Sequence, residues 1–247
     1  MTSLLEARAL WKRFGAVVAT AELDIDVRFG EIHAVIGPNG AGKTTLLGLL
    51  SGELAADSGR IFLDGREISG LPVYKRVRLG LGRTFQISSV FSTFTVLENV
   101  AIAIQATTPA GLALWRRAAT DEALNEAAAR VLARVSLAEL ADRPASALAH
   151  GERRLLELAI ALARRPRILL LDEPLAGVGP GDASQLLTIL DTVRQEAGIL
   201  LVEHDMDAVF RVSDRVTVLV NGRRIASGPA ERVRSDPDVR SAYLGDL

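Results

Sequence analysis

The first third of the chain alternates between short apolar runs and polar turns, a pattern that predicts a β-rich segment. Residues 4–10 and 21–27 alternate in part between apolar and polar positions, which is typical of strands with one buried face. A turn is predicted at Phe29-Gly30. Residues 61–63 form another apolar run, and Asp64-Gly65 after them predicts a second turn. We therefore expect a small lobe of short strands in this part of the chain.

Between these strands lies a segment with a different order of elements. Residues 32–36 are a short apolar run that ends in a glycine-rich turn, and residues 44–50 beyond the turn have helical character. A strand, a glycine-rich turn and a helix in this order are what a phosphate-binding site requires, because the backbone N–H groups at the start of the helix attract anions.

The pattern becomes helical in the middle third of the chain, from about residue 88 to residue 149. Within 121–135 the apolar positions recur at helical spacing, at Leu124, Ala128, Val131 and Val135. Thr120 is the predicted N-cap of this helix, because its hydroxyl can accept a hydrogen bond from a backbone N–H of the first turn. Residues 107–111 contain proline and glycine and predict a loop. We expect a helical lobe inserted into an α/β core.

Strands and helices alternate again after the middle third, which predicts that the α/β core resumes there. The expected strands are 168–171 and 199–202, and the expected helices are 153–164 and 183–196. Residues 216–220 are predicted to enter a hairpin whose turn is Asn221-Gly222, because both residues tolerate positive φ.

The glycine-rich turn matches the pattern G-x-x-x-x-G-K-[ST] over residues 37–44. Its glycines let the backbone curl so that successive N–H groups point at phosphate oxygens. Lys43 is expected to reach the β- and γ-phosphates of a nucleotide, and the Thr44 hydroxyl is expected to ligate Mg²⁺. The alternative is a turn that only links a strand to a helix. The residues expected to bind nucleotide here are Gly37, Pro38, Asn39, Gly40, Ala41, Gly42, Lys43, Thr44 and Thr45.

Two adjacent acids, Asp172 and Glu173, follow the apolar run 168–171. Because ligands bind at the carboxyl ends of strands in open α/β sheets, both carboxylates are expected to face the phosphate-binding turn. Asp172 is predicted to hold Mg²⁺ through a water, and Glu173 to orient or deprotonate the attacking water. Taken alone, the pair is better explained as solvated acids at a strand end, and the turn beside it favours the catalytic interpretation.

Composition excludes several classes of protein. Among the 247 residues 49% are hydrophobic and 24% are charged, which is typical of a globular chain. There is no cysteine, so disulfides and thiolate metal sites are excluded, and a net charge of −1 gives no general reason to bind nucleic acid. No apolar stretch approaches the roughly 20 residues of a transmembrane helix, and the N-terminal segment does not resemble a signal peptide. We expect a cytosolic protein.

Together these motifs resemble the ATP-binding cassette ATPases, the nucleotide-binding subunits of membrane transporters, over essentially the whole chain. The resemblance implies an α/β fold, a P-loop NTPase (RecA-like) core with an antiparallel β-subdomain and an inserted helical subdomain. Residues 1–87 and 159–247 would form the core with the β-subdomain, and 88–158 the helical subdomain. It further implies ATP and Mg²⁺ as cofactors and a second cassette subunit, identical or different. The dimer would dock on permease subunits at the inner face of the cell membrane, served by a substrate-binding protein, without nucleic acid.

Three residues outside the phosphate loop match functional positions of this family. Phe14 stands where an aromatic residue stacks on adenine, with a core aromatic as the alternative. Gln86 corresponds to a glutamine that contacts Mg²⁺ and opens the lobe facing the transporter, with an exposed loop glutamine as the alternative. His204 corresponds to a histidine that contacts the γ-phosphate, although a lone histidine is usually structural. The implied catalytic residues are Glu173, His204 and Lys43.

The segment 148–152 occupies the place of the family's signature motif, which grips the γ-phosphate of the ATP held by the other subunit. The implied cross-dimer contacts are Ala149, His150, Gly151 and Glu152. Ala149 replaces the usual serine and Glu152 the usual glutamine, while Gly179 stands where a cross-dimer loop commonly ends in aspartate. We expect function to survive these departures, but the contacts of the replaced side chains do not carry over.

Within the family, three short segments resemble the ATPases of branched-chain amino-acid importers: 82–86, 95–100 and 242–245. The segment 107–119, which contains Trp115, either resembles one of the two ATPases of such importers or is a solvated loop packed by one tryptophan. The expected function is therefore ATP-driven import of branched-chain or other small amino acids.

Other functions stay open at this stage. Importers of urea or amides and exporters of the lipopolysaccharide type share much of the pattern. The replacements at Ala149, Glu152 and Gly179 are also compatible with a regulatory nucleotide-binding module of low activity. A soluble cassette acting on DNA or ribosomes usually carries two cassettes, a long coiled coil or basic arms, and this sequence has none of them.

Overall fold

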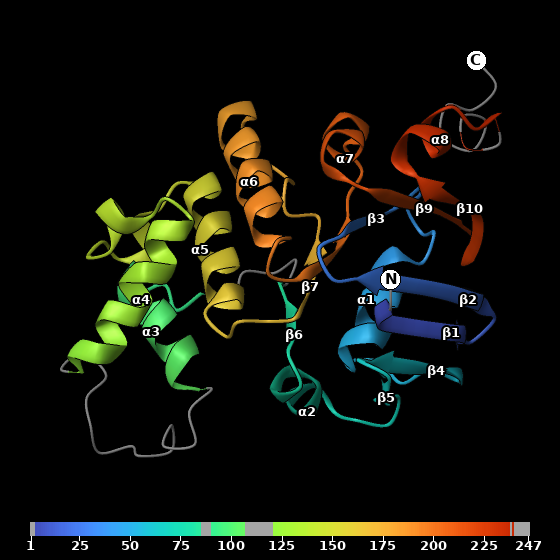
Figure 1. Ribbon diagram of the computed structural model, residues 1–247, viewed down its shortest axis with the longest axis horizontal. Helices are drawn as coiled ribbons and strands as arrows, with labels where there is room; N and C mark the ends of the chain where they lie inside the picture. Colours follow the sequence, from blue (N-terminus) through green and yellow to red (C-terminus); the bar gives the residue numbers. More distant parts are fainter. Residues whose placement is uncertain (1–2, 85–89, 107–120, 238, 240–247) are drawn as a thin grey trace. The chain divides into compact units, whose positions relative to one another are not determined.

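The computed structural model describes residues 3–84, 90–106, 121–237 and 239, and it divides the chain into two compact units (Figure 1). The first unit comprises Met1–Arg83, Arg167–Glu173 and Asp191–Leu247, and the second comprises Thr84–Pro166 and Pro174–Leu190. The second unit extends beyond the helical subdomain that was predicted at 88–158, because it also includes residues 159–166 and 174–190. The predicted domain boundaries therefore differ from those of the two units, and the division into subdomains stays a prediction.

A six-stranded sheet in the order β10-β9-β3-β8-β7-β6 runs through the first unit (Figure 1). Its strands are β3 (Ile32–Ile36), β6 (Leu81–Arg83), β7 (Ile168–Asp172), β8 (Gly198–Val202), β9 (Arg215–Val220) and β10 (Arg223–Pro229). Neighbouring strands are parallel except in the β9–β10 hairpin at one edge. Asn221 and Gly222, both at positive φ, form the turn of this hairpin. The predicted core strands and the predicted hairpin are confirmed.

The first unit also contains an antiparallel four-stranded sheet in the order β2-β1-β4-β5, which confirms the predicted lobe of N-terminal strands. Its strands are β1 (Ser3–Phe14), β2 (Val17–Arg28), β4 (Ser58–Leu63) and β5 (Arg66–Glu67). Helix α1 (Lys43–Ser51) shares one apolar cluster with both sheets, where its Leu46 and Leu50 lie with Leu10 of β1 and Leu170 of β7. Apolar contacts on two sides therefore fix the helix that follows the glycine-rich turn.

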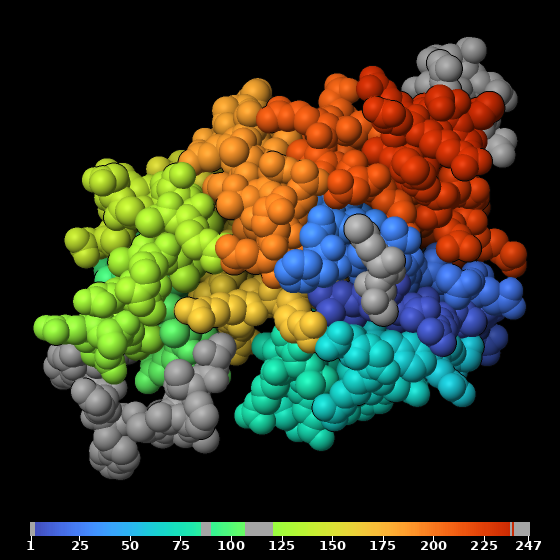
Figure 2. All heavy atoms as spheres, viewed as in Figure 1, coloured from blue at the N-terminus to red at the C-terminus, as the bar shows by residue number. Residues whose placement is uncertain are grey.

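The parallel strands are apolar on both faces, as expected for a sheet that is covered on both sides. Val35 of β3 belongs to the cluster around α1, whereas Ala34 and Ile36 pack with α7 (Met206–Val212) and α8 (Ala230–Arg234). The C-terminal hairpin lies beside β2, where the N–H of Ala21 donates to the carbonyl of Gly222 over 2.9 Å (Figure 2).

A buried arginine holds the far end of α1. Arg76, in α2 (Val73–Arg78), is 2% exposed and donates to the carbonyl oxygens of Leu49 and Leu50 at 2.7 and 2.8 Å. The last carbonyls of a helix have no partner inside the helix, and a cation there also interacts favourably with the helix dipole. The sequence pattern did not predict α2, because a six-residue helix has too few turns to show a period.

Helices make up the second unit, as the sequence predicted for the middle of the chain. They are α3 (Val96–Gln105), α4 (Glu122–Arg134), η3 (Ala138–Leu140), η4 (Ala145–Ala147), α5 (His150–Leu162) and, as far as Leu190, α6 (Pro180–Val193). Helices α3, α4 and α5 contact one another (Figure 1). Helix α3 begins with reciprocal hydrogen bonds in which the Thr95 hydroxyl accepts from the N–H of Glu98 and the Glu98 carboxylate from that of Thr95.

Three predicted helix starts differ from the structure. The N-cap of α4 is Asp121, whose carboxylate accepts from the N–H of Leu124 over 3.2 Å, so the prediction of Thr120 is wrong. Thr120 itself lies outside the described residues. Helices α5 and α6 begin three residues before their predicted starts at 153 and 183. In α6 the first residue is Pro180, which suits that position because its fixed φ is helical and no N–H is needed there.

A buried histidine links three strands of the first unit. His33 of β3 is 1% exposed, with Nδ1 2.6 Å from the carbonyl oxygen of Asp26 and Nε2 2.8 Å from the hydroxyl of Thr217. Burial, and then the positive charge of Arg215, lower the pKa of His33 to about 4. The folded protein therefore keeps this imidazole neutral at pH values where the unfolded chain protonates it.

We expect the protein to lose stability as the pH falls from about 6.5 to about 4, because in this window the unfolded chain binds a proton that the folded chain excludes. The loss from His33 alone is about 3 kcal/mol when the pH reaches 4. Urea unfolding at several pH values measures it. The variant His33→Gln keeps hydrogen-bonding groups but does not titrate, so its unfolding free energy should depend less on pH in this window. An equal pH dependence in both proteins would contradict the assignment.

Candidate nucleotide-binding site

The glycine-rich turn joins the end of β3 to the start of α1, as predicted. Gly42 has φ 102° and a Cβ at this position would overlap the carbonyl oxygen of Ala19, so only glycine fits. A Cβ at Gly37 would likewise overlap the carbonyl oxygen of Leu219. No side chain caps the N-terminus of α1, so the N–H groups of its first turn keep their capacity to bind an anion.

Lys43 is the first residue of α1, and its side chain lies over this turn. Its ammonium group donates to the carbonyl oxygens of Gly37 at 2.6 Å and Pro38 at 3.1 Å. Burial lowers the pKa of Lys43, whereas the negative charges of Glu173 and Asp172 raise it. The ammonium and the two carboxylates therefore lie close enough to interact electrostatically, as the sequence led us to expect.

Asp172 ends β7, and its side chain is 1% exposed. Its Oδ2 lies 3.3 Å from a guanidinium nitrogen of Arg83, while Oδ1 is buried and accepts no hydrogen bond from any residue that the structure describes. Burial raises the pKa of Asp172, and the charge of Arg83 opposes that shift. A buried carboxylate oxygen that lacks a donor fits a role toward Mg²⁺ or one of its waters, because hard cations take oxygen ligands.

Glu173 follows Asp172 in a backbone conformation that few residues adopt. Its φ is 47°, in the left-handed region, and its N–H donates to the carbonyl oxygen of Val202 over 2.9 Å. The side chain is 23% exposed, so a water molecule can reach it, whereas Asp172 is closed to solvent. Non-glycine residues in this region are often found at functional sites.

His204 follows β8 and lies beside Glu173. Its Nδ1 is 3.9 Å from a carboxylate oxygen of Glu173 and 3.8 Å from one of Glu203, and its backbone N–H donates to Glu203. The His204 side chain is 61% exposed, while that of Glu203 is completely buried. Because Asp172 and Val202 are paired in the sheet, β7 and β8 end together, and this brings Glu173 and His204 to one edge.

Phe14 ends β1 and is 48% exposed, which a core aromatic would not be. The ammonium of Lys12 lies 5.4 Å from the centre of its ring. Asp57 fixes this part of the strand, because its carboxylate accepts from Lys12 Nζ at 2.9 Å and from the N–H of Arg13 at 2.8 Å. The ring is therefore open to a stacking partner while the strand that carries it is anchored.

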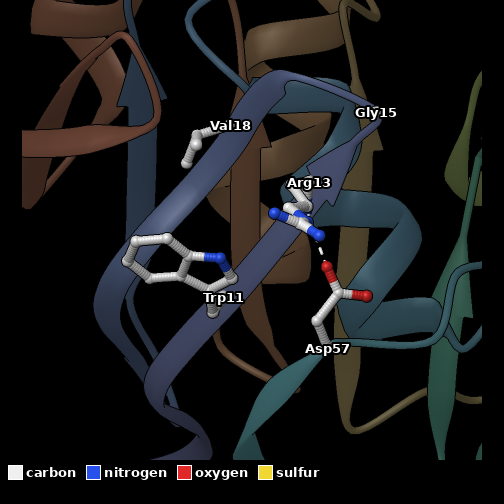
Figure 3. Close-up of a pocket in the computed structure, with 5 residues that line it drawn as sticks. All are labelled: Trp11, Arg13, Gly15, Val18 and Asp57. Atoms are coloured by element: carbon white, nitrogen blue, oxygen red, sulfur yellow. Dashed lines mark hydrogen bonds between the residues drawn. The ribbon is translucent and has the colours of Figure 1, made fainter.

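A hollow of about 560 Å³ opens near this end of the β1–β2 hairpin (Figure 3). The residues that line it are Trp11, Arg13, Gly15, Val18 and Asp57. Neither Phe14 nor any residue of the phosphate loop belongs to this lining, although Arg13 and Gly15 flank Phe14 in the chain.

In the second unit, α5 begins within the segment that resembles the signature motif. No side chain caps this helix at Ala149, and the Glu152 carboxylate accepts from the N–H of Ala149 over 2.8 Å. The His150 ring nitrogen Nε2 lies 3.1 Å from the carbonyl oxygen of Ala176. A Cβ at Gly151 would overlap the Asp182 carboxylate, so Asp182 packs against this helix start. Two acids therefore lie at a helix N-terminus that the resemblance assigns to a phosphate.

Some predicted site residues lie outside the described part of the chain. They are Gln86, Trp115 and the segments 107–119 and 242–245. No role was predicted from the sequence for Asp57, Arg83 or Glu203, although Arg83 lies in the segment 82–86 and Glu203 precedes His204. The structure shows them hydrogen-bonded to Lys12, Asp172 and His204, respectively. Among the described residues, no helix is long and apolar enough to cross a membrane, and no three acidic or histidine side chains form a metal cluster.

Known proteins with similar sequences and structures are numerous. Residues 20–176 match the family model described as ABC transporter, and residues 223–246 match one described as Branched-chain amino acid ATP-binding cassette transporter. The chain is 41% identical to BraF of Pseudomonas aeruginosa and 40% identical to LivG of Escherichia coli, with 98% of each chain covered in both comparisons. Both are named high-affinity branched-chain amino acid transport ATP-binding proteins. The ADP conformation of MJ1267, an ATP-binding cassette of an ABC transporter, superposes with a TM-score of 0.89 at 32% identity over the whole of both chains.

Proposed function

Because this chain belongs to the ATP-binding cassette family of transport proteins, we propose that it is the ATP-hydrolysing subunit of an importer of branched-chain amino acids. The observation that carries the proposal is the meeting of Lys43, Asp172, Glu173 and His204 at one edge of the sheet, beside an uncapped helix N-terminus. The names of BraF and LivG, and the C-terminal match to a branched-chain transporter model, support the choice of cargo.

In this proposal the phosphate loop binds ATP and the strand ends act on its γ-phosphate. The amides at the start of α1 and the Lys43 ammonium hold the β- and γ-phosphates, and Phe14 stacks on adenine. Thr44, Gln86 and Asp172 would hold Mg²⁺, which supplies charge neutralisation on the phosphates when it is bound.

The hydrolytic step needs positioning and proton transfer rather than a covalent intermediate. Glu173, which is partly exposed, orients the attacking water and accepts its proton. His204 contacts the γ-phosphate from the end of the neighbouring strand, 3.9 Å from Glu173. The products are ADP and inorganic phosphate, and no proton transfer is assigned to the buried Asp172.

Two such subunits, identical or different, would complete each other's sites. The segment 149–152 of one subunit contacts the ATP held by the phosphate loop of the other, through the backbone N–H groups at the start of α5. The segment that includes Gln86 faces permease subunits at the inner face of the membrane. ATP-driven closure of the dimer then changes the state of the permease, and hydrolysis reopens it.

Reconstitution tests both the activity and the cargo. The chain is purified with its permease subunits, placed in vesicles with ATP inside, and supplied with the binding protein outside. We expect uptake of labelled leucine or valine that requires ATP, with urea and glutamate as control cargoes. Uptake of urea but not of leucine would contradict the cargo, and ATP hydrolysis without any transport would contradict the assembly.

A regulatory module of low activity is a second candidate, which the contacts around α5 favour. Ala149 supplies no hydroxyl, Glu152 occupies the N–H of Ala149, and Asp182 packs against Gly151. Negative charge at this helix start weakens the attraction for a phosphate. ATP turnover that stays at background when permease and binding protein are present would support this candidate and contradict the proposed ATPase.

A further inference from the structure

Arg83 is a buried arginine whose guanidinium lies between the phosphate-loop helix and the strand that ends in Asp172. It is the last residue of β6, and its side chain is 8% exposed. One nitrogen donates to the Ser51 hydroxyl at 2.9 Å and to the Glu53 carboxylate at 2.8 Å, and another donates to Asp172 Oδ2 at 3.3 Å. Arg83 lies in the segment 82–86, three residues before Gln86, but no role at the nucleotide site was predicted for it from the sequence.

These contacts connect two ends of the candidate site. Helix α1 carries the phosphate loop at its N-terminus, and Ser51 and Glu53 lie at and just beyond its C-terminus. Asp172 lies at the end of β7, which pairs with β6 in parallel. The planar guanidinium has its donors in a fixed arrangement, so engaging partners on two sides fixes the orientation of each.

The two oxygens of Asp172 are consequently in different environments. Arg83 occupies Oδ2, while Oδ1 is buried and has no hydrogen-bond partner among the described residues. Among the described residues, the contact with Arg83 is the only hydrogen bond that fixes the plane of the Asp172 carboxylate. The arginine thus selects one orientation and leaves one specific oxygen available.

We propose that Arg83 is a positioning residue of the nucleotide site, which orients Asp172 so that its second oxygen is presented to the divalent cation that accompanies the nucleotide. The inference rests on the proposed function, in which Asp172 acts toward that cation. Residues that hydrogen-bond to a metal ligand commonly orient it in this way, and their loss costs about 10- to 100-fold in metal affinity.

Charge and orientation predict opposite results for the loss of this arginine. A guanidinium beside the metal site repels a divalent cation, so removing it would strengthen cation binding if charge were its main effect. If orientation is its main effect, removing it weakens cation binding. The direction of the change in cation affinity therefore shows whether Arg83 orients Asp172 or acts mainly through its positive charge.

The test uses the full chain and Mn²⁺ as the probe of the divalent cation. Affinity for ATP is measured in EDTA by calorimetry, and affinity for Mn²⁺ is measured on the ATP-loaded protein from the electron paramagnetic resonance signal of free Mn²⁺. For Arg83→Gln we expect unchanged ATP affinity in EDTA and about 10- to 100-fold weaker Mn²⁺ binding. Arg8→Gln, an exposed arginine paired with Glu6, is the matched control and should change neither quantity.

Two further variants keep the test decisive if Arg83→Gln does not fold. Arg83→Lys keeps the positive charge but lacks the planar arrangement of donors of the guanidinium, so Mn²⁺ binding should weaken here too. Glu53→Gln removes a charge that anchors Arg83 and should produce a smaller weakening. Unchanged or tighter Mn²⁺ binding in the folded variants would overturn the inference, and so would an equal loss of ATP affinity in EDTA. If the unaltered protein binds neither ATP nor Mn²⁺, the proposed function itself fails.

Discussion

Replacement of Lys43 by alanine should abolish detectable ATP binding. The ammonium lies over the phosphate loop, donating to the carbonyls of Gly37 and Pro38, and it is the cation expected to meet the terminal phosphates. Hydrogen bonds to charged groups contribute about 1.5–3 kcal/mol each. The loss of two such bonds, one to the β-phosphate and one to the γ-phosphate, therefore weakens ATP binding by about 10²- to 10⁴-fold. Isothermal titration calorimetry with ATP measures the effect directly.

The matched control is Lys75→Ala, which removes an exposed lysine from α2 in the same unit. It should bind ATP as the unaltered protein does. Circular dichroism checks that Lys43→Ala is folded, since this variant also loses the two contacts within the loop. Unchanged nucleotide affinity in a folded Lys43→Ala protein would refute the assignment of the phosphate site.

Replacement of Glu173 by glutamine should stop turnover while ATP binding persists. Glutamine keeps the shape of the side chain but cannot accept the proton of the attacking water, and a general base contributes about 10²- to 10⁴-fold to rate. Release of inorganic phosphate measures turnover, and calorimetry measures binding. Because ATP then stays bound, the variant is also expected to accumulate as a dimer, which size-exclusion chromatography with ATP detects.

Glu22→Gln is the control for making this substitution in a left-handed backbone conformation like that of Glu173. Glu22 is an exposed glutamate with φ 50°, so the substitution is made in the same left-handed conformation, away from the candidate site. Its phosphate release should equal that of the unaltered protein. Release at the unaltered rate by Glu173→Gln would remove Glu173 from the role of general base.

Sequence patterns were most informative where the cause is local. The phosphate loop was predicted from the spacing of its glycines before Lys43. The structure shows why glycine is needed at Gly37 and Gly42, since other backbone atoms approach both positions too closely for a side chain. The Asn221-Gly222 turn was predicted because both residues tolerate the positive φ that such a turn requires. The buried strands β7 and β8 were recognisable because a strand covered on both faces is a nearly continuous apolar run.

Helix boundaries were predicted less well, because several residues competed for each cap. Thr120 and Asp121 are both good N-cap residues, and only the structure shows that the Asp121 carboxylate accepts from Leu124. Helix α3 was missed although Thr95 and Glu98 have the spacing of a reciprocal cap, since the segment was considered only for its resemblance to a family motif. A capping signal at that spacing could have located its start.

The sequence by itself determined which chemical groups the chain brings to a nucleotide: a glycine-rich turn, one lysine, two adjacent acids and a histidine after an apolar run. Only the tertiary structure decided which of them share a site and what holds them. Arg83 and Asp172 are 89 residues apart, and the pairing of β6 with β7 brings them together. The reason is that a motif records constraints between neighbours in the chain, whereas the partner of a buried charge is set by which strands lie side by side.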